Sequence, residues 1–411
     1  MYDGFDRCPL TDDRRKEDGW SMKLSEEAYR QLYGQILPFW KGLRDHQRGG
    51  FVSLVDFDLR RCAEAERGCI LNSRILWFFS EAYRTLGDAD LLDDAHHAYA
   101  MLRKMEDKEY GGVYWSVWPD GTVADSTKHT YNQAFAIYAL SSFYRASGCS
   151  EALSKAMELM GIIESRMCDE DGYLEAFHRD FSRTGNEKLS ENGVNATRTM
   201  NTLLHLLEAY TNLYEVSEDT VVRGKILHIL DVWEKYIFDP EQRRQNVFFD
   251  EKYRSLLDLH SYGHDIEASW LCDHTLDVLK NEPLTNRLRP MLMSLPEEVY
   301  RKAYTHRGVC NECECSRIDT TRVWWVQAEA LLGFLNAWRR TGEERYLDAS
   351  RSLWRFIGET ISDPRPGSEW FWSTDEEGKP VQRPIVSNWK CPYHNGRMLL
   401  EIIRRYGDVQ L

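Results

Sequence analysis

The stretch ILWFFSEAYRTLGDADLLDDAHHAYAMLRKM, from Ile75 to Met105, contains two amphipathic segments that meet at Gly87. In both segments apolar residues recur at three- and four-residue spacing, which is typical of a helix that buries one face. Glycine readily adopts the backbone conformation that ends a helix. The stretch therefore predicts a hairpin of two helices, of which the first is the more apolar.

This hairpin pattern recurs along the chain. FAIYALSSFYRASG (135–148), LLHLLEAYTNLYEVS (203–217) and ALLGFLNAWRRTG (330–342) show the same helical spacing. Two of them end, like the first, in a glycine that is expected to stop the helix, Gly148 and Gly342. Aromatic segments, most of them beside a glycine, separate the units at steps of about 60–75 residues, and such a period indicates one supersecondary unit used repeatedly. Their marker residues are Gly50, Gly112, Gly172, Val247, Gly308 and Trp370.

Six such hairpins can stack as an open solenoid or close into a ring. The starts of the apolar helices carry polar and aromatic groups, which a cavity accommodates better than a solenoid core does. We therefore predict an all-α fold, an (α/α)6 barrel (a six-hairpin toroid) with short β-hairpins or loops at one end. An α/β fold is disfavoured because no β–α–β alternation occurs. Residues 1–411 are expected to form a single (α/α)6 catalytic domain with a short N-terminal extension of about 20 residues.

The overall charge argues against several classes of partner. The net charge is −14, and no basic stripe occurs, so neither nucleic acid nor an anionic membrane is an expected partner.

The first twenty residues lack the apolar stretch of a secretory signal. No apolar run approaches the roughly 18–20 residues of a membrane span. We expect a cytoplasmic protein that is a monomer or a weak homodimer.

Ten cysteines are scattered along the chain, and reduced thiols are expected for most of them. One cluster, HRGVCNECEC, contains His306, Cys310, Cys313 and Cys315. This spacing leaves two alternatives, a zinc site or a loop of reduced thiols. The spacing is tight and no second C-x2-C follows, so the reduced loop is preferred.

Polar and aromatic side chains share one face at the starts of the six apolar helices. Taken singly, each has a structural explanation: a histidine satisfied in the core, an arginine paired with an acid, or a buried tryptophan. Histidines at the same place in three repeats favour a shared site instead. The candidates are Arg74, Tyr131, Asn201, His205, His264, Glu267, Trp325, Glu329, Trp389 and His394.

Four segments together resemble the cellobiose 2-epimerase branch of the N-acylglucosamine 2-epimerase family. They are MNTLLHLLEAYTNLY (200–214), YGHDIEASWL (262–271), WWVQAEALLGF (324–334) and WKCPYHNGRM (389–398). The likeness extends from SRILWFFSEAYR (73–84) to the end of the chain. It implies an (α/α)6 barrel, a disaccharide substrate and no metal or redox cofactor. The loop 310–319 departs from the family pattern near the distal sugar subsite.

The resemblance also implies roles for the candidates. His264 and His394 are similar to the two acid/base residues, His205 to a third active-site histidine, and Arg74 to the partner of an anionic intermediate. The side chains similar to those that line the sugar site are Tyr131, Asn201, Glu267, Trp325, Glu329 and Trp389.

The implied reaction inverts C2 of the reducing-end glucose of cellobiose, and also of lactose or related β-1,4 disaccharides, to mannose. After ring opening, one imidazole removes the C2 proton and a second returns a proton on the opposite face. Imidazole suits both tasks because its pKa lies near neutrality. Arg74 would stabilise the enediolate, Glu267 is expected to orient His264, and Trp325 and Trp389 could stack on sugar rings.

Four alternatives remain open. A β-1,4-mannobiose 2-epimerase differs only in hydroxyl orientation. An aldose–ketose isomerase, or an enzyme like N-acylglucosamine 2-epimerase, shares the enediolate. A glycoside hydrolase needs two carboxylates, for which Glu267 and Glu329 are candidates. A non-enzymatic binding protein would not need three histidines at helix starts.

Overall fold

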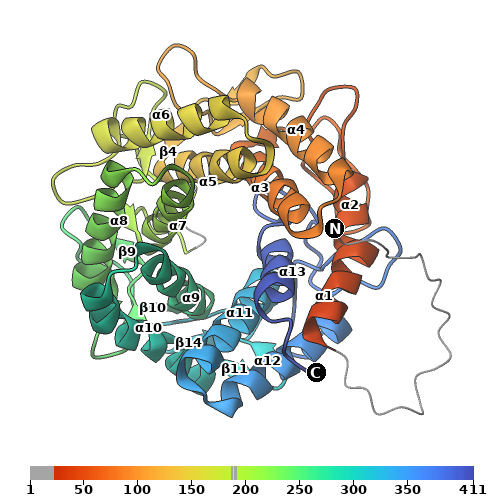
Figure 1. Cartoon of the computed structure of the whole chain (residues 1–411), viewed down its shortest axis with the longest axis vertical. Helices are drawn as coiled ribbons and strands as arrows, with labels where there is room; N and C mark the ends of the chain where they lie inside the picture. Colours follow the sequence, from red (N-terminus) through yellow and green to blue (C-terminus); the bar gives the residue numbers. More distant parts are fainter. Residues whose placement is uncertain (1–22, 187, 189–191) are drawn as a thin grey trace, which may run out of the picture.

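The computed structural model describes residues 23–186, 188 and 192–411, and within them six helices form an inner ring around one axis (Figure 1). The predicted N-terminal extension of about 20 residues lies outside the described residues. The inner helices are α3 (Cys69–Leu86), α5 (Thr130–Ser147), α7 (Met200–Ser217), α9 (Tyr262–Leu279), α11 (Trp324–Thr341) and α13 (His394–Arg405).

A second ring of helices surrounds the first. Five of its helices each follow an inner helix: α4 (Ala89–Lys104), α6 (Ser150–Arg166), α8 (Thr220–Val232), α10 (Glu282–Lys302) and α12 (Glu344–Phe356). The predicted (α/α)6 barrel is thereby confirmed. Helices α8 and α12 continue into π-helical turns, Trp233–Ile237 and Ile357–Ile361.

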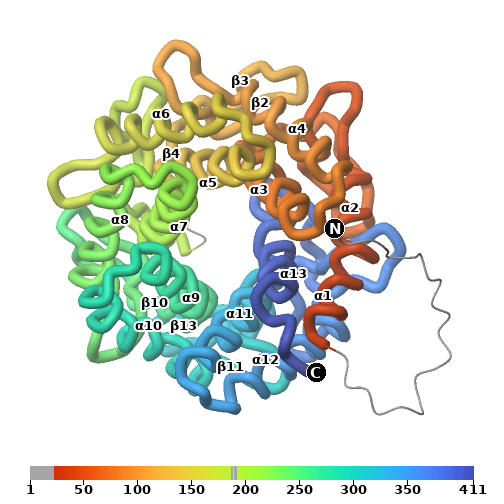
Figure 2. Tube along the Cα trace, in the orientation of Figure 1, coloured from red at the N-terminus to blue at the C-terminus, as the bar shows by residue number. Residues whose placement is uncertain are grey.

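The ring is closed by the two ends of the described chain. The sixth outer helix comes from the N-terminal part, where α1 (Leu24–Gln31) runs through a π-helical turn (Leu32–Ile36) into α2 (Leu37–Lys41). It packs beside the last inner helix, α13, as the trace shows (Figure 2). A β-bridge between Lys23 and Gln410 joins the two ends. The last inner helix is therefore paired with the first outer helix.

Left-handed residues form the tight turns from inner to outer helices. Gly87, Gly148 and Gly342, the three expected helix stops, each have φ of +73° and cap α3, α5 and α11. Glu218 and Lys280 take the same place after α7 and α9 with φ of +50°. A single residue with positive φ therefore reverses the chain in five hairpins.

Short antiparallel strands join neighbouring repeats at the end of the barrel where the inner helices begin. The strand before each of five inner helices pairs with the aromatic segment of the next repeat, and a bridge between Val55 and Val386 makes the sixth joint. The pairs are β1 (Arg67–Gly68) with β2 (Ser116–Val117), β4 (Lys128–His129) with β5 (Ala176–Phe177), β6 (Arg198–Thr199) with β9 (Phe248–Phe249), β10 (Leu259–Ser261) with β13 (Glu312–Glu314), and β15 (Arg322–Val323) with β16 (Ser373–Thr374).

The remaining strands extend or flank these joints. They are β3 (Val123–Asp125) beside β2, β14 (Arg317–Asp319) beside β13, β7 (Phe238–Asp239) with β8 (Arg244–Gln245), and β11 (Tyr304–Thr305) with β12 (Gly308–Val309). Strands β1, β4, β6, β10 and β15 each run directly into an inner helix, so their pairing sets where that helix starts.

The inner helices approach each other closely at glycines. A Cβ atom at Gly333 of α11 would lie 2.3 Å from Cγ1 of Ile266 on α9 and 2.9 Å from its carbonyl oxygen. At Gly396 of α13 it would lie 2.6 Å from the ring of Phe78 on α3. Within the described part of the chain, none of the helices has the length and apolarity needed to cross a membrane.

Candidate active site

The first turns of the six inner helices surround a cavity of about 250 Å³. Nine of the ten predicted side chains line it: Arg74, Tyr131, Asn201, His205, His264, Glu267, Trp325, Trp389 and His394. The tenth, Glu329, does not line the cavity but contacts His394. Residues more than 300 positions apart in the sequence therefore meet, because each helix start faces the same axis.

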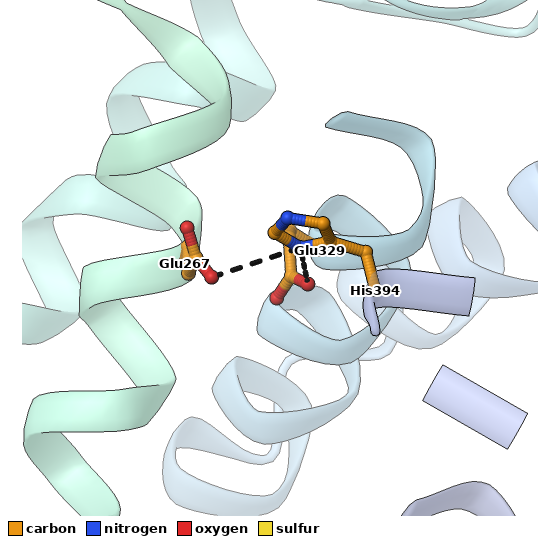
Figure 3. Close-up of side chains that lie close together, drawn as sticks. All are labelled: Glu267, Glu329 and His394. Carbon is orange, nitrogen blue, oxygen red and sulfur yellow. Dashed lines mark hydrogen bonds and ion pairs between the residues drawn. The ribbon is translucent and has the colours of Figure 1, made fainter. Parts of the chain in front are cut away.

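His394 is held by a carboxylate from the neighbouring inner helix. Its Nδ1 lies 2.7 Å from Oε1 of Glu329 and 3.8 Å from Oε1 of Glu267, as the close-up shows (Figure 3). Oε1 of Glu329 also accepts from Arg397 and so acts as an acceptor. Nδ1 of His394 therefore carries the hydrogen, which leaves Nε2 as a base. Burial lowers the pKa of His394 well below its usual value, so the ring is neutral at pH 7.

His264 has a different partner. Its Nδ1 lies 2.7 Å from Oγ of Ser261, the last residue of β10, and its ring packs against Trp325 with centroids 4.7 Å apart. Burial, reinforced by the nearby His205, lowers the pKa of His264 to about 3. The expectation that Glu267 orients this ring is wrong. The carboxylate of Glu267 accepts from Arg397 instead, and the partner of Nδ1 of His264 is Ser261.

His205 is oriented within its own helix. Its Nδ1 lies 2.9 Å from Oε2 of Glu208, one turn later on α7. Burial alone would raise the pKa of Glu208, but Arg397 and His205 hold it at about 2, so this carboxylate is ionised. Burial also lowers the pKa of His205. Two of the three histidines thus donate Nδ1–H to a carboxylate.

Arg74 is a buried cation beside the cavity. Its Nη2 lies 2.9 Å from the hydroxyl of Tyr131, and its guanidinium carbon lies 4.1 Å from the ring centroid of Phe135. Its side chain is 3% exposed, and in the described part of the chain its contacts include no carboxylate. The structure therefore does not support the alternative that Arg74 simply pairs with an acidic side chain. A desolvated guanidinium without an anion is suited to stabilise negative charge that develops in the cavity.

Indole rings form part of the cavity wall. Trp325 contacts both acid/base candidates, with ring centroids 4.7 Å from His264 and 5.5 Å from His394. Trp389 also lines the cavity, with its ring centroid 6.2 Å from that of Tyr131 and 6.0 Å from that of Trp115. Flat apolar rings with one polar edge suit the faces of a pyranose.

Glu267, Glu329 and His394 have ligand atoms within 4.8 Å of one another, a spacing that a metal ion could bridge. These two carboxylates already form ion pairs with a cationic side chain, that of Arg397. Arg397 donates from Nη2 to Glu267 at 2.5 Å and to Glu329 at 2.7 Å. The cluster is accounted for by this guanidinium, which is not among the ten candidates of the sequence analysis.

Known proteins resemble this chain along most of its length. Residues 49–396 match the sequence profile of N-acylglucosamine 2-epimerase (GlcNAc 2-epimerase). The chain belongs to the N-acylglucosamine 2-epimerase family. A cellobiose 2-epimerase of Eubacterium cellulosolvens is 47% identical over 397 residues, which cover 92% of this chain and 98% of that protein.

Solved structures of the same family agree with the fold. The cellobiose 2-epimerase of Bacillus thermoamylovorans B4167 superposes with a TM-score of 0.90 at 43% identity and covers 93% of this chain and 99% of its own. A sugar epimerase from a ruminal bacterium gives 0.92 at 45% identity with the same coverage. The predicted resemblance to the cellobiose 2-epimerase branch of the N-acylglucosamine 2-epimerase family is confirmed.

The cysteine-rich loop borders the site in this member of the family. Strand β13 pairs with β10, which places Glu312 opposite Ser261 and brings Asn311 and Glu312 to the cavity. Among residues 23–186, 188 and 192–411, no group of potential metal ligands includes the three cysteines of this loop. Cys310 is buried with Sγ 3.2 Å from Nη1 of Arg322. The geometry therefore gives the zinc alternative no support.

Several cavity residues were missed by sequence reasoning. Ser261 immediately precedes the segment YGHDIEASWL, and its position three residues before His264 was the available signal. Trp324 begins α11, beside the candidate Trp325. The others lie in loops or strands, where no local sequence pattern indicates that the chain approaches the cavity: Lys188, Asn192, Glu312, Trp372 and Arg383.

Proposed function

We propose that this chain inverts C2 of the reducing-end glucose of cellobiose and related β-1,4 disaccharides, an isomerase reaction. The observation that carries the proposal is the placement of two neutral imidazoles, His264 and His394, around one cavity and against the same ring of Trp325. The similarity to proteins named cellobiose 2-epimerase supports the choice of substrate. We further propose that the barrel acts as one catalytic domain.

Proton transfer at C2 needs a base on one face of the carbon and an acid on the other. The substrate ring first opens to the aldehyde, which acidifies the C2 proton. One imidazole removes that proton and an enediolate forms. The other imidazole, beside the new negative charge, takes up a proton from water and delivers it to the opposite face of C2, and the first imidazole then releases its proton to water. Burial keeps both rings neutral before substrate binds. A well-placed acid or base contributes about 10²–10⁴ in rate.

The enediolate is negatively charged, and Arg74 supplies the nearest buried cation without a carboxylate partner. A guanidinium fixed by Tyr131 needs no reorganisation when charge develops, which is the condition for electrostatic stabilisation. Arg74 thus lowers the barrier mainly through the intermediate rather than through ground-state binding.

A disaccharide requires space beyond the reacting sugar. The cavity continues toward polar and aromatic side chains at its mouth, where Arg383 lies 3.9 Å from the ring centroid of Trp372. Asn192 donates to Glu312 and Glu314, which ties the cysteine-rich loop to this mouth. We propose that the mouth holds the non-reducing sugar.

The proposal is tested by incubating the protein with cellobiose in heavy water. We expect glucosyl-mannose with deuterium at C2 of the reducing residue. Free glucose would indicate a hydrolase, and a ketose product would indicate an aldose–ketose isomerase. Comparing kcat/KM for cellobiose, lactose and β-1,4-mannobiose shows which of these β-1,4 disaccharides is the preferred substrate. His264→Ala and His394→Ala should each abolish product while circular dichroism stays unchanged.

A further inference from the structure

Arg397 does not line the catalytic cavity, but it contacts Glu267, which does. Its side chain is 2% exposed, and it follows His394 by three residues on α13. A second cavity of about 290 Å³, at the opposite ends of the inner helices, is bordered by Arg397 together with Glu208 and Trp270. Among the described residues that line the catalytic cavity, Arg397 is not included. It is therefore placed to act through other side chains rather than on a substrate.

The guanidinium joins carboxylates from three inner helices. It donates at 2.5 Å to Glu208 of α7, at 2.5 Å to Glu267 of α9 and at 2.7 Å to Glu329 of α11. Two of these carboxylates hold histidines. Glu208 accepts from Nδ1 of His205 and Glu329 from Nδ1 of His394. One arginine thus binds the two carboxylates that orient two imidazoles, and these imidazoles come from different helices.

We propose that Arg397 is a positioning residue that fixes His205 and His394 in one and the same tautomer. By binding Glu208 and Glu329 through its two Nη atoms, it keeps both carboxylates as acceptors, so that both rings carry hydrogen on Nδ1 and present Nε2 to the cavity. A planar fork can hold two carboxylates in fixed directions, whereas an ammonium group cannot. This inference rests on the proposed epimerase function for its kinetic consequence only.

The charges around the network determine what happens when Arg397 is removed. The facing groups from the inner helices are Arg74 on α3, Tyr138 on α5, His205 and Glu208 on α7, Glu267 on α9, Glu329 on α11, and Tyr393 and His394 at the start of α13. Three carboxylates meet one guanidinium, and burial with the nearby Glu329 raises the pKa of Glu267 to about 8. Without Arg397 this cluster takes up protons.

The sign of the effect on the histidines follows from the same contacts. Burial lowers the pKa of His394, and the positive charge of Arg397 lowers it further. Burial also lowers the pKa of His205; Glu208 opposes this shift, whereas Arg74 and Arg397 add to it. Removing the guanidinium therefore raises both imidazole pKa values. A histidine with a raised pKa is protonated, and so cannot act as a base, up to a higher pH. The acid limb of the kcat/KM profile therefore shifts to higher pH.

The decisive test reads the imidazoles directly. ¹⁵N NMR of histidine-labelled protein distinguishes the Nδ1–H tautomer, the Nε2–H tautomer and the imidazolium. At pH 7 we expect neutral Nδ1–H rings for His205 and His394, and protonated or mixed rings in Arg397→Met. His264, which is held by Ser261, is an internal control whose signal should stay constant. Unchanged His205 and His394 signals in the folded variant would overturn the proposal.

Kinetics of matched variants separate charge from geometry. Arg397→Lys retains the charge but not the fork, so we expect an acid limb at the wild-type pH, kcat lower by on the order of 10²-fold, and KM within a few-fold. Wild-type kcat in this variant would contradict the proposal. Arg404→Met is the control, since Arg404 lies two turns later on α13 and pairs with Glu81, outside the network. It should leave the tautomers and the acid limb unchanged.

The two proposals fail in different ways. A wild-type protein without epimerase activity but with the expected tautomers would reject the proposed function and leave the role of Arg397 standing. If Arg397→Met does not fold, Arg397→Lys and Glu329→Gln still decide the question, because the NMR signal of His394 must change in Glu329→Gln while that of His264 stays.

Discussion

Nδ1 of His394 lies 2.7 Å from Oε1 of Glu329, a residue 65 positions earlier in the chain. The contact crosses from α13 to α11 and fixes the ring so that its other nitrogen faces the cavity. Trp270 donates to the second oxygen of Glu329 at 3.0 Å, so the carboxylate itself cannot rotate away. The base and its orienting group are thus built from three helices.

Glu329→Gln should lower kcat for cellobiose by about 10²–10⁴-fold with little change in KM. The amide of glutamine can donate to Nδ1 of His394 and thereby stabilise the wrong tautomer. Steady-state kinetics over a range of cellobiose concentrations measure both constants. Glu282→Gln, an exposed position at the start of α10, is the matched control and should behave as wild type. A normal kcat in Glu329→Gln would show that Glu329 does not orient His394 for catalysis.

Ser261→Ala should have a smaller effect, about a tenfold fall in kcat, because a neutral hydroxyl contributes less than a carboxylate to holding an imidazole. The ring of His264 keeps its contact with Trp325 in this variant. Ser294→Ala on α10 removes a hydroxyl that bonds only to the backbone and serves as control. Equal losses in the two variants would show that Ser261 has no specific role.

Arg74→Met should separate activity from stability. We expect kcat to fall by about 10²–10³-fold because the enediolate loses its cation. The folded state should keep or gain stability, since a buried charge without an acid partner is replaced by an apolar chain of similar length. Thermal unfolding and kinetics on the same preparation measure both. A large drop in Tm together with normal kcat would contradict this assignment.

Stability should decrease as the pH falls from about 6.5 toward 3. Burial lowers the pKa of His264 and of His129 to about 3 in the folded protein, whereas an unfolded histidine titrates near 6.5. Between these values the unfolded chain binds more protons, so the free energy of unfolding rises with pH in this window. Urea unfolding at pH 7 and pH 5 measures the slope. His264→Asn should make it shallower; an unchanged slope would show that this group does not contribute.

Gly333→Ala should destabilise the barrel by about 1–3 kcal/mol, because the added methyl group overlaps Ile266 where α11 meets α9. Gly161→Ala is the matched control. Gly161 also lies within a helix, but a Cβ atom there meets nothing within 4 Å, so the exchange should stabilise by about 0.5–1 kcal/mol. Chemical denaturation measures both. Opposite signs are expected, and equal effects would mean that the close helix packing is not what Gly333 provides.

The helical part of the fold was readable from the sequence because its signals are local. Gly87, Gly148 and Gly342 each predicted a helix stop, and each caps an inner helix with a left-handed residue. The pairing of the sixth hairpin was not readable. The outer partner of α13 comes from residues 24–41 at the other end of the described chain, and no periodic pattern records which helix closes a ring.

The sequence by itself determined the repeat, the inner and outer helices and the set of side chains at the helix starts, because apolar periodicity and turn residues act over a few positions. Only the tertiary structure decided how those side chains are paired. Glu267 shares a helix face with His264 yet bonds Arg397, 130 residues away, and Arg397 reaches Glu208 over 189 residues. Such contacts depend on the closure of the ring, which brings six helix starts to one axis and lets burial, not sequence spacing, select each partner.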